Sequence, residues 1–297
     1  MDLDRYGMDT ITLAGSLQPK LAAMKAAGFT QVMLSARDIV ADPAGEAGAI
    51  AAVRNSGLRV TGFQVLRDFE GLSGHLHAYK VDVAKAMLVM CHALGSRVLL
   101  VCSSTSTHAT ADRDHLVRDL QKLAMLAAPL GIRVAFEALS WGRHVNEYAR
   151  AWEIVQQADR SNLGIGVDSF HLLAMQSGFD RIEEIDAEKI FLVQLADFMW
   201  QELRSSEERI NTARHFRVFP GEGVHSDQVA QLVRKLDEIG YRGDYSFEVF
   251  NDDYQQLPLP MVVARAQASV KWLVSHVSRG SLLPWSRRAA APAPPAG

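Results

Sequence analysis

Short apolar segments alternate with longer helical segments along most of the chain. The short segments are rich in β-branched residues and fall at 10–13, 31–34, 58–63, 97–101, 132–136, 163–167, 189–193 and 244–247. Apolar residues recur with helical spacing in the longer segments, at 17–27, 79–94, 115–130, 146–158, 226–239 and 261–277. Strands that are apolar on both faces are typical of a parallel sheet covered by helices, and eight such units in about 250 residues predict a (β/α)₈ TIM barrel of the α/β class. An open doubly wound sheet is the alternative, but no Gly-x-Gly-x-x-Gly loop follows any of these segments.

The barrel pattern occupies most of the chain, so we expect a single domain over residues 1–280 and a C-terminal extension over 281–297. The end of the chain, RRAAAPAPPAG at 287–297, lacks large apolar side chains, which predicts disorder from about residue 287. Segment 197–222 has no clear barrel pattern and is rich in Arg and Glu. We expect this segment to form a long, partly helical loop after the seventh strand, and such loops often cover an active site.

The charge and cysteine content exclude several classes of protein. Lys and Arg total 31 against 34 Asp and Glu, and this near balance argues against a surface that grips nucleic acid phosphates. Only two cysteines occur, Cys91 and Cys102, which excludes a disulfide framework and favours a reducing compartment. No apolar stretch is long enough to span a membrane, and the first residues, MDLDRYGMDT, lack the pattern of a signal peptide. We therefore expect a cytoplasmic protein with no nucleic acid or membrane partner.

A polar residue ends each of the last four predicted strands. These residues are Glu137, Asp168, Gln194 and Glu248. In a parallel barrel all strand ends meet on one face, where catalytic groups lie, so we expect the four side chains to converge. A polar residue at one strand end is common because the chain is leaving the core, but four in succession are harder to obtain by accident. Three converging carboxylates repel each other, and a divalent cation held by oxygen ligands resolves that repulsion; Mg²⁺ or Mn²⁺ suits such a site, and Co²⁺ shares the ligand types.

One histidine, His171, lies three residues after Asp168. Histidine titrates near neutral pH, so this side chain could take a proton from a carbon beside a polarised carbonyl. It could also orient a metal ligand, or be an ordinary loop residue. Of these interpretations we favour acid/base catalysis.

Arginines form a second group of candidates, because a guanidinium binds a substrate carboxylate through two parallel hydrogen bonds. Arg67 lies just beyond the third predicted strand, and Arg214 and Arg217 lie in the loop after the seventh. A salt bridge to neighbouring acidic residues is a competing interpretation for Arg67. Trp141 and His144 follow the fifth strand on the same face, where Trp141 could form a pocket wall and His144 could contact substrate or metal.

Six motifs carry a resemblance to a known family: FQVLRDFEG at 63–71, FEALSWGRHVN at 136–146, VDSFH at 167–171, FLVQLAD at 191–197, RHFRVFPGEG at 214–223 and FEVFNDD at 247–253. Together they resemble the bacterial 3-dehydroshikimate dehydratases, within the xylose-isomerase-like barrel superfamily. The likeness covers about residues 8 to 275 and is densest in the second half. Some members of the family carry a second, dioxygenase-like domain after the barrel.

The resemblance implies metal-dependent dehydration of 3-dehydroshikimate to protocatechuate through a metal-stabilised enediolate. The four strand-end residues would hold the metal, His171 would be the acid/base, and Arg67 and Arg217 would bind the substrate. The sequence departs from the family in two places. The family often has an acidic stretch after the second strand, whereas this chain reads LSARD at 34–38, and Ala213 stands where a serine is usual. These departures bear on the exact substrate and not on the metal chemistry.

Other functions are weighed against this one. A sugar or inosose isomerase or epimerase would use the same metal site but return the proton to another carbon or face. Zinc-dependent cleavage of DNA at abasic sites needs more histidine ligands and a basic face, and a non-catalytic binding protein would not need the four strand-end residues. We expect a small cyclic hydroxy-keto acid as the partner, and the helix at 261–277 could support a homo-oligomer.

Overall fold

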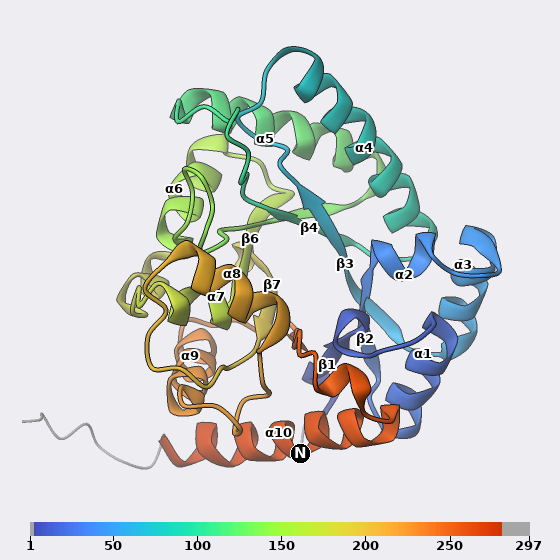
Figure 1. The fold of residues 1–297 in the computed structure, drawn as a ribbon. Coiled ribbons are helices and arrows are strands. Elements are labelled where there is room, and N and C mark those ends of the chain that lie inside the picture. Colours follow the sequence, from blue (N-terminus) through green and yellow to red (C-terminus); the bar gives the residue numbers. More distant parts are fainter. Residues whose placement is uncertain (1–2, 281–297) are drawn as a thin grey trace, which may run out of the picture.

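Eight parallel strands close into a barrel in the computed structural model, which describes residues 3–280 (Figure 1). The strands are β1 Tyr6–Asp9, β2 Gln31–Ser35, β3 Arg59–Arg67, β4 Val98–Cys102, β5 Arg133–Glu137, β6 Leu163–Asp168, β7 Ile190–Leu195 and β8 Tyr245–Phe247. Each strand pairs with the next in the chain, and β8 pairs with β1 to close the ring. The predicted single-domain (β/α)₈ barrel is therefore confirmed.

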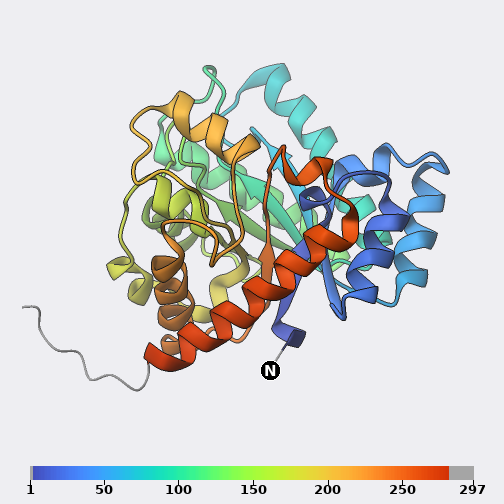
Figure 2. The ribbon, with the colours of Figure 1, turned by 60° about the horizontal axis from the view of Figure 1, so that its bottom comes forward.

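Helices surround the barrel. They are α1 Leu17–Ala26, α2 Ala36–Val40, α3 Gly45–Ser56, α4 Gly74–Ala93, α5 Arg113–Ala127, α6 Tyr148–Ala158, α7 Ser169–Ala174, α8 Ser206–His215, α9 Ser226–Glu238 and α10 Leu259–Gly280. Short 3₁₀ helices lie at Leu3–Arg5, Thr10–Thr12, Ala128–Leu130, Asp180–Glu184, Ala187–Lys189 and Tyr254–Gln256. The long α10 packs against both α1 and α9, so it joins the first and last parts of the helical ring (Figure 2).

The position predicted for the first strand, 10–13, is wrong. The strand is β1, four residues earlier, and Thr10–Thr12 forms a 3₁₀ turn whose first backbone amides are capped by Asp9, which accepts a hydrogen bond from Ile11 N at 3.0 Å. The two threonines of this turn are fully buried, which gave the segment the β-branched pattern of a strand. Thr12 Oγ1 donates to Phe247 O at 3.1 Å and so holds the turn against the end of β8.

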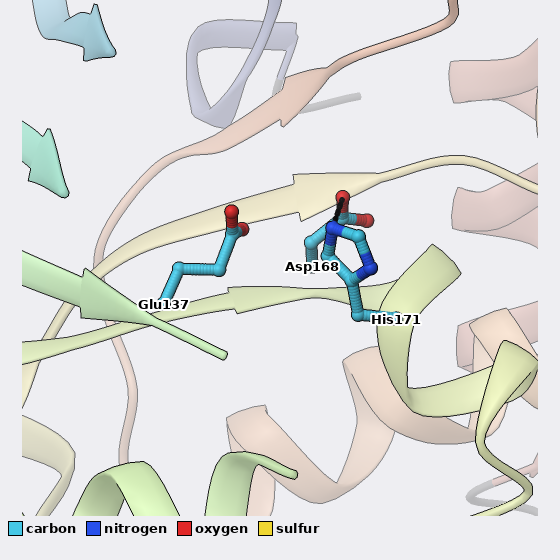
Figure 3. Close-up of side chains that lie close together, drawn as sticks. All are labelled: Glu137, Asp168 and His171. Atoms are coloured by element: carbon cyan, nitrogen blue, oxygen red, sulfur yellow. Dashed lines mark ion pairs between the residues drawn. The ribbon is translucent and has the colours of Figure 1, made fainter. Parts of the chain in front are cut away.

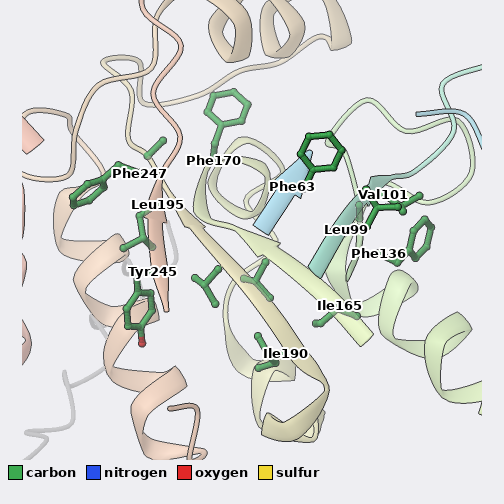
Figure 4. Close-up of a cluster of buried hydrophobic side chains, with 14 of the residues drawn as sticks. Phe63, Leu99, Val101, Phe136, Ile165, Phe170, Ile190, Leu195, Tyr245 and Phe247 are labelled. Carbon is green, nitrogen blue, oxygen red and sulfur yellow. The ribbon is translucent and has the colours of Figure 1, made fainter. Parts of the chain in front are cut away.

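The core has two layers because side chains alternate along each strand. Leu99 and Val101 of β4 belong to the large cluster between the sheet and the helices, part of which is drawn in Figure 4. Leu100 and Cys102 of the same strand belong to a small cluster inside the barrel, packed with Leu139. This inner cluster fills the barrel beneath the carboxyl ends of the strands, where the candidate site lies.

The region between β7 and α9 contains the predicted long, partly helical loop. It holds α8, and an isolated bridge pairs Asp197 with Val218 near its two ends. Within residues 3–280 no helix has both the length and the apolar composition needed to cross a bilayer. The predicted extension over 281–297, including the disorder from about residue 287, lies outside the described residues.

Candidate active site

A cavity of about 480 Å³ opens at the carboxyl ends of the strands. Its polar wall includes Arg67, Cys102, Glu137, His171, Arg217 and Glu248. These residues come from distant parts of the chain and meet here because parallel strands all end on this face. The apolar wall includes Leu139, Trp141 and Phe250.

Glu137 and Asp168 are the last residues of β5 and β6, and His171 lies in the helix that follows β6. One ligand atom from each of these three side chains lies within 4.8 Å of the others, and all three residues are buried (Figure 3). Asp168 Oδ1 caps α7 by accepting a hydrogen bond from Phe170 N at 2.8 Å. The cap fixes the first turn of α7, which carries His171 and brings its Nε2 to 3.6 Å from Asp168 Oδ2.

Gln194 and Glu248 lie beside this group. Gln194 is buried in β7 and is the register partner of Asp168 in β6. Glu248 directly follows β8 and is linked to Asp168 through Arg217, whose Nη1 donates to Asp168 Oδ2 at 2.7 Å and to Glu248 Oε2 at 3.0 Å. All four strand-end residues named from the sequence therefore lie on one face, with a buried guanidinium between two of them.

The three buried carboxyls of Glu137, Asp168 and Glu248 outnumber the one guanidinium, of Arg217, that is buried among them. Burial raises the pKa of Glu137 well above its ordinary value, and the charges of Asp168 and Glu248 raise it further. Burial also raises the pKa of Glu248, although Arg217 opposes that shift. When all three carboxyls are ionised, one guanidinium leaves two negative charges uncompensated, which is the charge of one divalent cation.

Two buried polar atoms support a fit to a divalent ion. Glu137 Oε1 and Gln194 Nε2 are buried and have no hydrogen-bond partner among the residues that the structure describes. An unpaired polar atom in the interior is costly, so each such atom calls for a ligand or a water. The amide of Gln194 can present its oxygen in place of its nitrogen by a half turn, because the two atoms have nearly the same shape. The donor set is therefore mainly oxygen, as Mg²⁺ and Mn²⁺ prefer.

His171 is held by Ser140 on one side and by aromatic rings on others. Ser140 N donates to His171 Nδ1 at 3.1 Å, so the neutral ring in this arrangement carries its proton on Nε2, which faces Asp168. Ser140 Oγ also lies 3.1 Å from Nδ1 and accepts its proton in the other tautomer. The ring of Trp141 meets the His171 ring edge-on with centroids 5.1 Å apart. Burial, together with Arg217 and Arg67, lowers the pKa of His171 well below its ordinary value, so the ring is neutral at neutral pH.

The three arginines have different environments. Arg67 and Arg214 line the cavity and are exposed, and within residues 3–280 their guanidinium groups make no hydrogen bond or ion pair. The competing salt bridge from Arg67 to its acidic neighbours is absent, because Asp68 and Glu70 accept hydrogen bonds from Thr105 N and Ser104 N instead.

Arg217 is only 2% exposed and is committed to two carboxylates. Its guanidinium also lies over the Phe170 ring, 4.4 Å from the centroid, and its Nε donates to Ala213 O at 3.0 Å. Through these contacts Arg217 fixes Asp168 and Glu248 in position. The guanidinium groups of Arg67 and Arg214, which make no such contacts within residues 3–280, can bind a ligand.

Trp141 and His144, the two candidates after the fifth strand, have different positions in the structure. Trp141 lines the cavity, as the sequence suggested. His144 is not part of the cavity lining, and its Nε2 lies within hydrogen-bond distance, 2.9 Å, of Ala109 O. His144 therefore anchors its own loop to a neighbouring one.

Three residues of the site were missed. Asp9 ends β1, is fully buried, and contacts the side-chain amide of Gln64, which also hydrogen-bonds Glu248. Cys102 ends β4 and donates from Sγ to Glu137 Oε2 at 3.1 Å. The signal for Asp9 and Cys102 was available, since both are strand-end residues. The first predicted strand begins after Asp9, and the fourth predicted strand ends at residue 101, one position before Cys102.

Comparison with known proteins places this chain among related barrels. A model of a protein family described as xylose isomerase-like TIM barrel matches residues 21–276. A 3-dehydroshikimate dehydratase of Pseudomonas putida is 36% identical over 268 residues, which are 89% of this chain and 41% of that protein. An inosose isomerase of Halalkalibacterium halodurans is 32% identical over 164 residues, 54% of this chain and 54% of that protein. The chain thus spans less than half the length of the dehydratase relative.

Solved structures agree on the fold. A xylose isomerase-like TIM barrel/4-hydroxyphenylpyruvate dioxygenase fusion protein superposes with a TM-score of 0.87 at 33% identity, covering 98% of this chain and 46% of that one. The structure of an IOLI protein with a bound zinc atom superposes with a TM-score of 0.78 at 22% identity, covering 93% of this chain and 98% of that one. At that identity the second likeness concerns the fold alone.

Proposed function

We propose that this chain, a member of the xylose isomerase-like TIM barrel family, is a metal-dependent dehydratase that converts 3-dehydroshikimate to protocatechuate. One observation carries the proposal: the buried carboxylates of Glu137, Asp168 and Glu248 lie close to a cavity that is also lined by Arg67 and Arg214. Such a cavity suits a small acid whose ring carries a ketone and hydroxyl groups. The sequence similarity to a protein named 3-dehydroshikimate dehydratase selects this acid among others.

The proposed metal ligands are Glu137, Asp168, Gln194 and Glu248, and the proposed ion is Mg²⁺ or Mn²⁺, with Co²⁺ as an alternative. The unpaired Glu137 Oε1 and the two uncompensated charges support this assignment. When bound, a divalent ion supplies positive charge that stabilises the negative charge developing on a carbonyl oxygen as a neighbouring proton leaves. Arg217 holds the carboxylates of Asp168 and Glu248 in place.

Substrate orientation is assigned to the free arginines and the apolar wall. Arg67 and Arg214 bind the substrate carboxylate through paired hydrogen bonds, since their guanidinium groups make no hydrogen bond or ion pair within residues 3–280. Trp141, Leu139 and Phe250 cover the faces of the ring and exclude water from it. This wall matches the planar aromatic product better than a flexible open-chain sugar.

Proton movement is assigned to His171. This role uses the tautomer in which Nδ1–H donates to Ser140 Oγ and the hydrogen bond from Ser140 N to Nδ1 is given up. Nε2 is then bare and accepts the proton from the substrate carbon next to the ketone. His171 Nε2 then returns this proton to the β-hydroxyl, which leaves as water. A proton moves from the ring CH2 to the ketone oxygen, and the ring of the substrate becomes aromatic. The reaction removes one water and needs no oxidant or reductant. Aromatisation makes it downhill, so the protein has mainly to orient and polarise the substrate.

A keto-polyol isomerase or epimerase remains the second candidate, because inosose isomerases also resemble part of the chain. An isomerase must return the proton to a different carbon or face, which requires a second acid or base across the substrate. Besides the proposed metal ligands, the cavity lining includes one histidine, His171, and the cationic Arg67 and Arg214. This arrangement favours dehydration.

An absorbance assay tests the proposal. Protein freed of metal by a chelator is mixed with 3-dehydroshikimate, with and without Mn²⁺, and the ultraviolet band of protocatechuate is followed. We expect turnover only with the ion, and a loss of about 100-fold or more in Glu137→Gln. The matched control is Glu147→Gln, an exposed glutamate outside the cavity, which should act like wild type. Turnover of inosose without formation of protocatechuate would support the second candidate instead.

We further propose a cytoplasmic protein whose partner is a small molecule. Both cysteines are free and buried, which suits a reducing compartment. A homo-oligomer built on the exposed face of α10 is compatible with this proposal, and analytical ultracentrifugation would report it.

A further inference from the structure

Cys102 occupies the end of β4, beside the first proposed metal ligand. It is the register partner of Glu137 at the end of β5. Paired residues on neighbouring strands project their side chains to the same face and lie side by side. The Cys102 thiol accordingly donates to Glu137 Oε2 at 3.1 Å, and both residues are almost fully buried, at 4% and 3% exposed.

The two carboxylate oxygens of Glu137 have different surroundings. Oε2 receives the thiol proton, whereas Oε1 is buried without any hydrogen-bond partner among the described residues. Cys102 also belongs to the inner apolar cluster with Leu100 and Leu139, so the S–H···O contact lies between this cluster and the cavity. A hydrogen bond in such an apolar setting restricts the carboxylate more than an exposed one does.

We propose that Cys102 is a positioning residue that holds Glu137 Oε2, so that Glu137 binds the divalent ion through Oε1 alone. The inference rests on the metal site of the proposed function and adds a residue and a binding mode to it. A cysteine suits this position because it combines the bulk of a small apolar residue, which packs against Leu100, with one weak donor. Partners that orient metal ligands in this way typically change metal affinity 10- to 100-fold when removed.

The test begins with Mn²⁺ binding, measured by titration calorimetry on protein stripped with a chelator. Cys102→Ala should weaken Mn²⁺ binding about tenfold, because the freed carboxylate loses its fixed orientation. Cys102→Ser retains a donor at the same place and should recover most of the affinity. The matched control is Cys91→Ala. Cys91 is also buried, but its thiol lies near Ser96 O and Val98 O in the outer layer, so this variant should bind Mn²⁺ like wild type.

A second measurement needs no substitution at the site. The infrared S–H stretching band of wild type should shift when Mn²⁺ binds, because the ion withdraws electrons from the carboxylate that accepts the thiol proton. Cys91→Ala should keep this shift. A band that does not move, or a Cys102→Ala protein that binds Mn²⁺ as tightly as wild type, would overturn the inference. Equal weakening by Cys91→Ala would do the same, since it would point to general loosening of the barrel.

The outcomes separate this inference from the proposed function. If wild type binds no Mn²⁺, the metal site fails and the role of Cys102 fails with it. If wild type binds Mn²⁺ with the expected dependence on Cys102 but does not turn over 3-dehydroshikimate, only the substrate assignment is wrong.

Discussion

Arg217 Nη1 lies 2.7 Å from Asp168 Oδ2, although the two residues are separated by 49 positions in the chain. The same nitrogen reaches Glu248 Oε2 at 3.0 Å, so one buried cation serves two of the proposed metal ligands. Breaking a buried ion pair leaves an uncompensated charge in the interior, which is strongly destabilising. Arg217 is thus a structural requirement of the site as well as part of its cavity wall.

Removal of this guanidinium should destabilise the metal-free protein. We expect Arg217→Leu to lower the free energy of unfolding by about 3 to 5 kcal/mol, measured by urea denaturation. Mn²⁺ should recover part of that loss, because it supplies the missing positive charge. The control is Arg265→Gln, which removes an exposed pair with Glu222 and should cost about 1 kcal/mol or less. Equal losses in the two variants would contradict the role assigned to Arg217.

Replacement of His171 by Ala should lower kcat by about 10²- to 10⁴-fold and leave Mn²⁺ content unchanged, since His171 moves a proton and is not among the proposed ligands. Steady-state kinetics and metal analysis of the same preparation measure both quantities. His92→Ala, an exposed histidine on α4, is the matched control and should be active. An active His171→Ala protein would exclude this histidine as the base.

Glu70 should contribute a pH dependence to stability. Burial raises the pKa of Glu70 to about 8, so the folded protein retains a proton there that the unfolded chain loses near the ordinary value of 4.5. Unfolding then releases a proton between these two values, and the stability contributed by Glu70 declines as pH rises through this window, by at most about 1.4 kcal/mol per pH unit.

Glu70→Gln should remove this component. Urea denaturation at several pH values between 5 and 8 would show a shallower decline in the free energy of unfolding for the variant than for wild type. Glu147→Gln, whose side chain is exposed, should leave the slope as it is. Parallel slopes for wild type and Glu70→Gln would mean that the buried carboxyl is ionised in the folded protein.

Metal binding should release protons. Burial and neighbouring carboxylates raise the pKa of Glu137, and burial raises that of Glu248, so both hold protons to a higher pH in the metal-free protein than isolated glutamates do. A divalent ion competes with those protons. The apparent affinity for Mn²⁺ should therefore rise with pH, and calorimetry in buffers of different ionisation enthalpy would count the protons released. An affinity independent of pH from 5 to 8 would contradict this account.

Much of the architecture could be predicted from the sequence, because period and strand-end chemistry are local. Alternation of apolar runs and helical segments predicted the barrel. Glu137 and Asp168 could be predicted as strand-end residues, and they end β5 and β6. The buried Thr10 and Thr12, however, led to a predicted first strand that lies four residues too late in the chain. Asp9 was therefore not recognised as a strand-end residue. A run of β-branched, apolar residues indicates that a segment is buried, and a buried 3₁₀ turn can contain the same residues as a strand.

Side-chain partnerships were beyond the reach of the sequence. Arg217 could be named as a cavity residue, but its commitment to Asp168 and Glu248 depends on the path of the long segment around α8. His144 was equally plausible as a site residue until the structure paired it with Ala109 O. Cys102 appeared apolar in the sequence, and only the register of β4 against β5 brings its thiol to Glu137.

The most direct measurement is a crystal structure of the protein soaked with Mn²⁺, with anomalous scattering data to locate the ion. We expect a single strong peak within coordination distance of Glu137 Oε1 and of oxygens from Asp168, Gln194 and Glu248. A peak elsewhere, or a well-ordered cavity without one at millimolar Mn²⁺, would show that these strand-end residues do not gather around an ion.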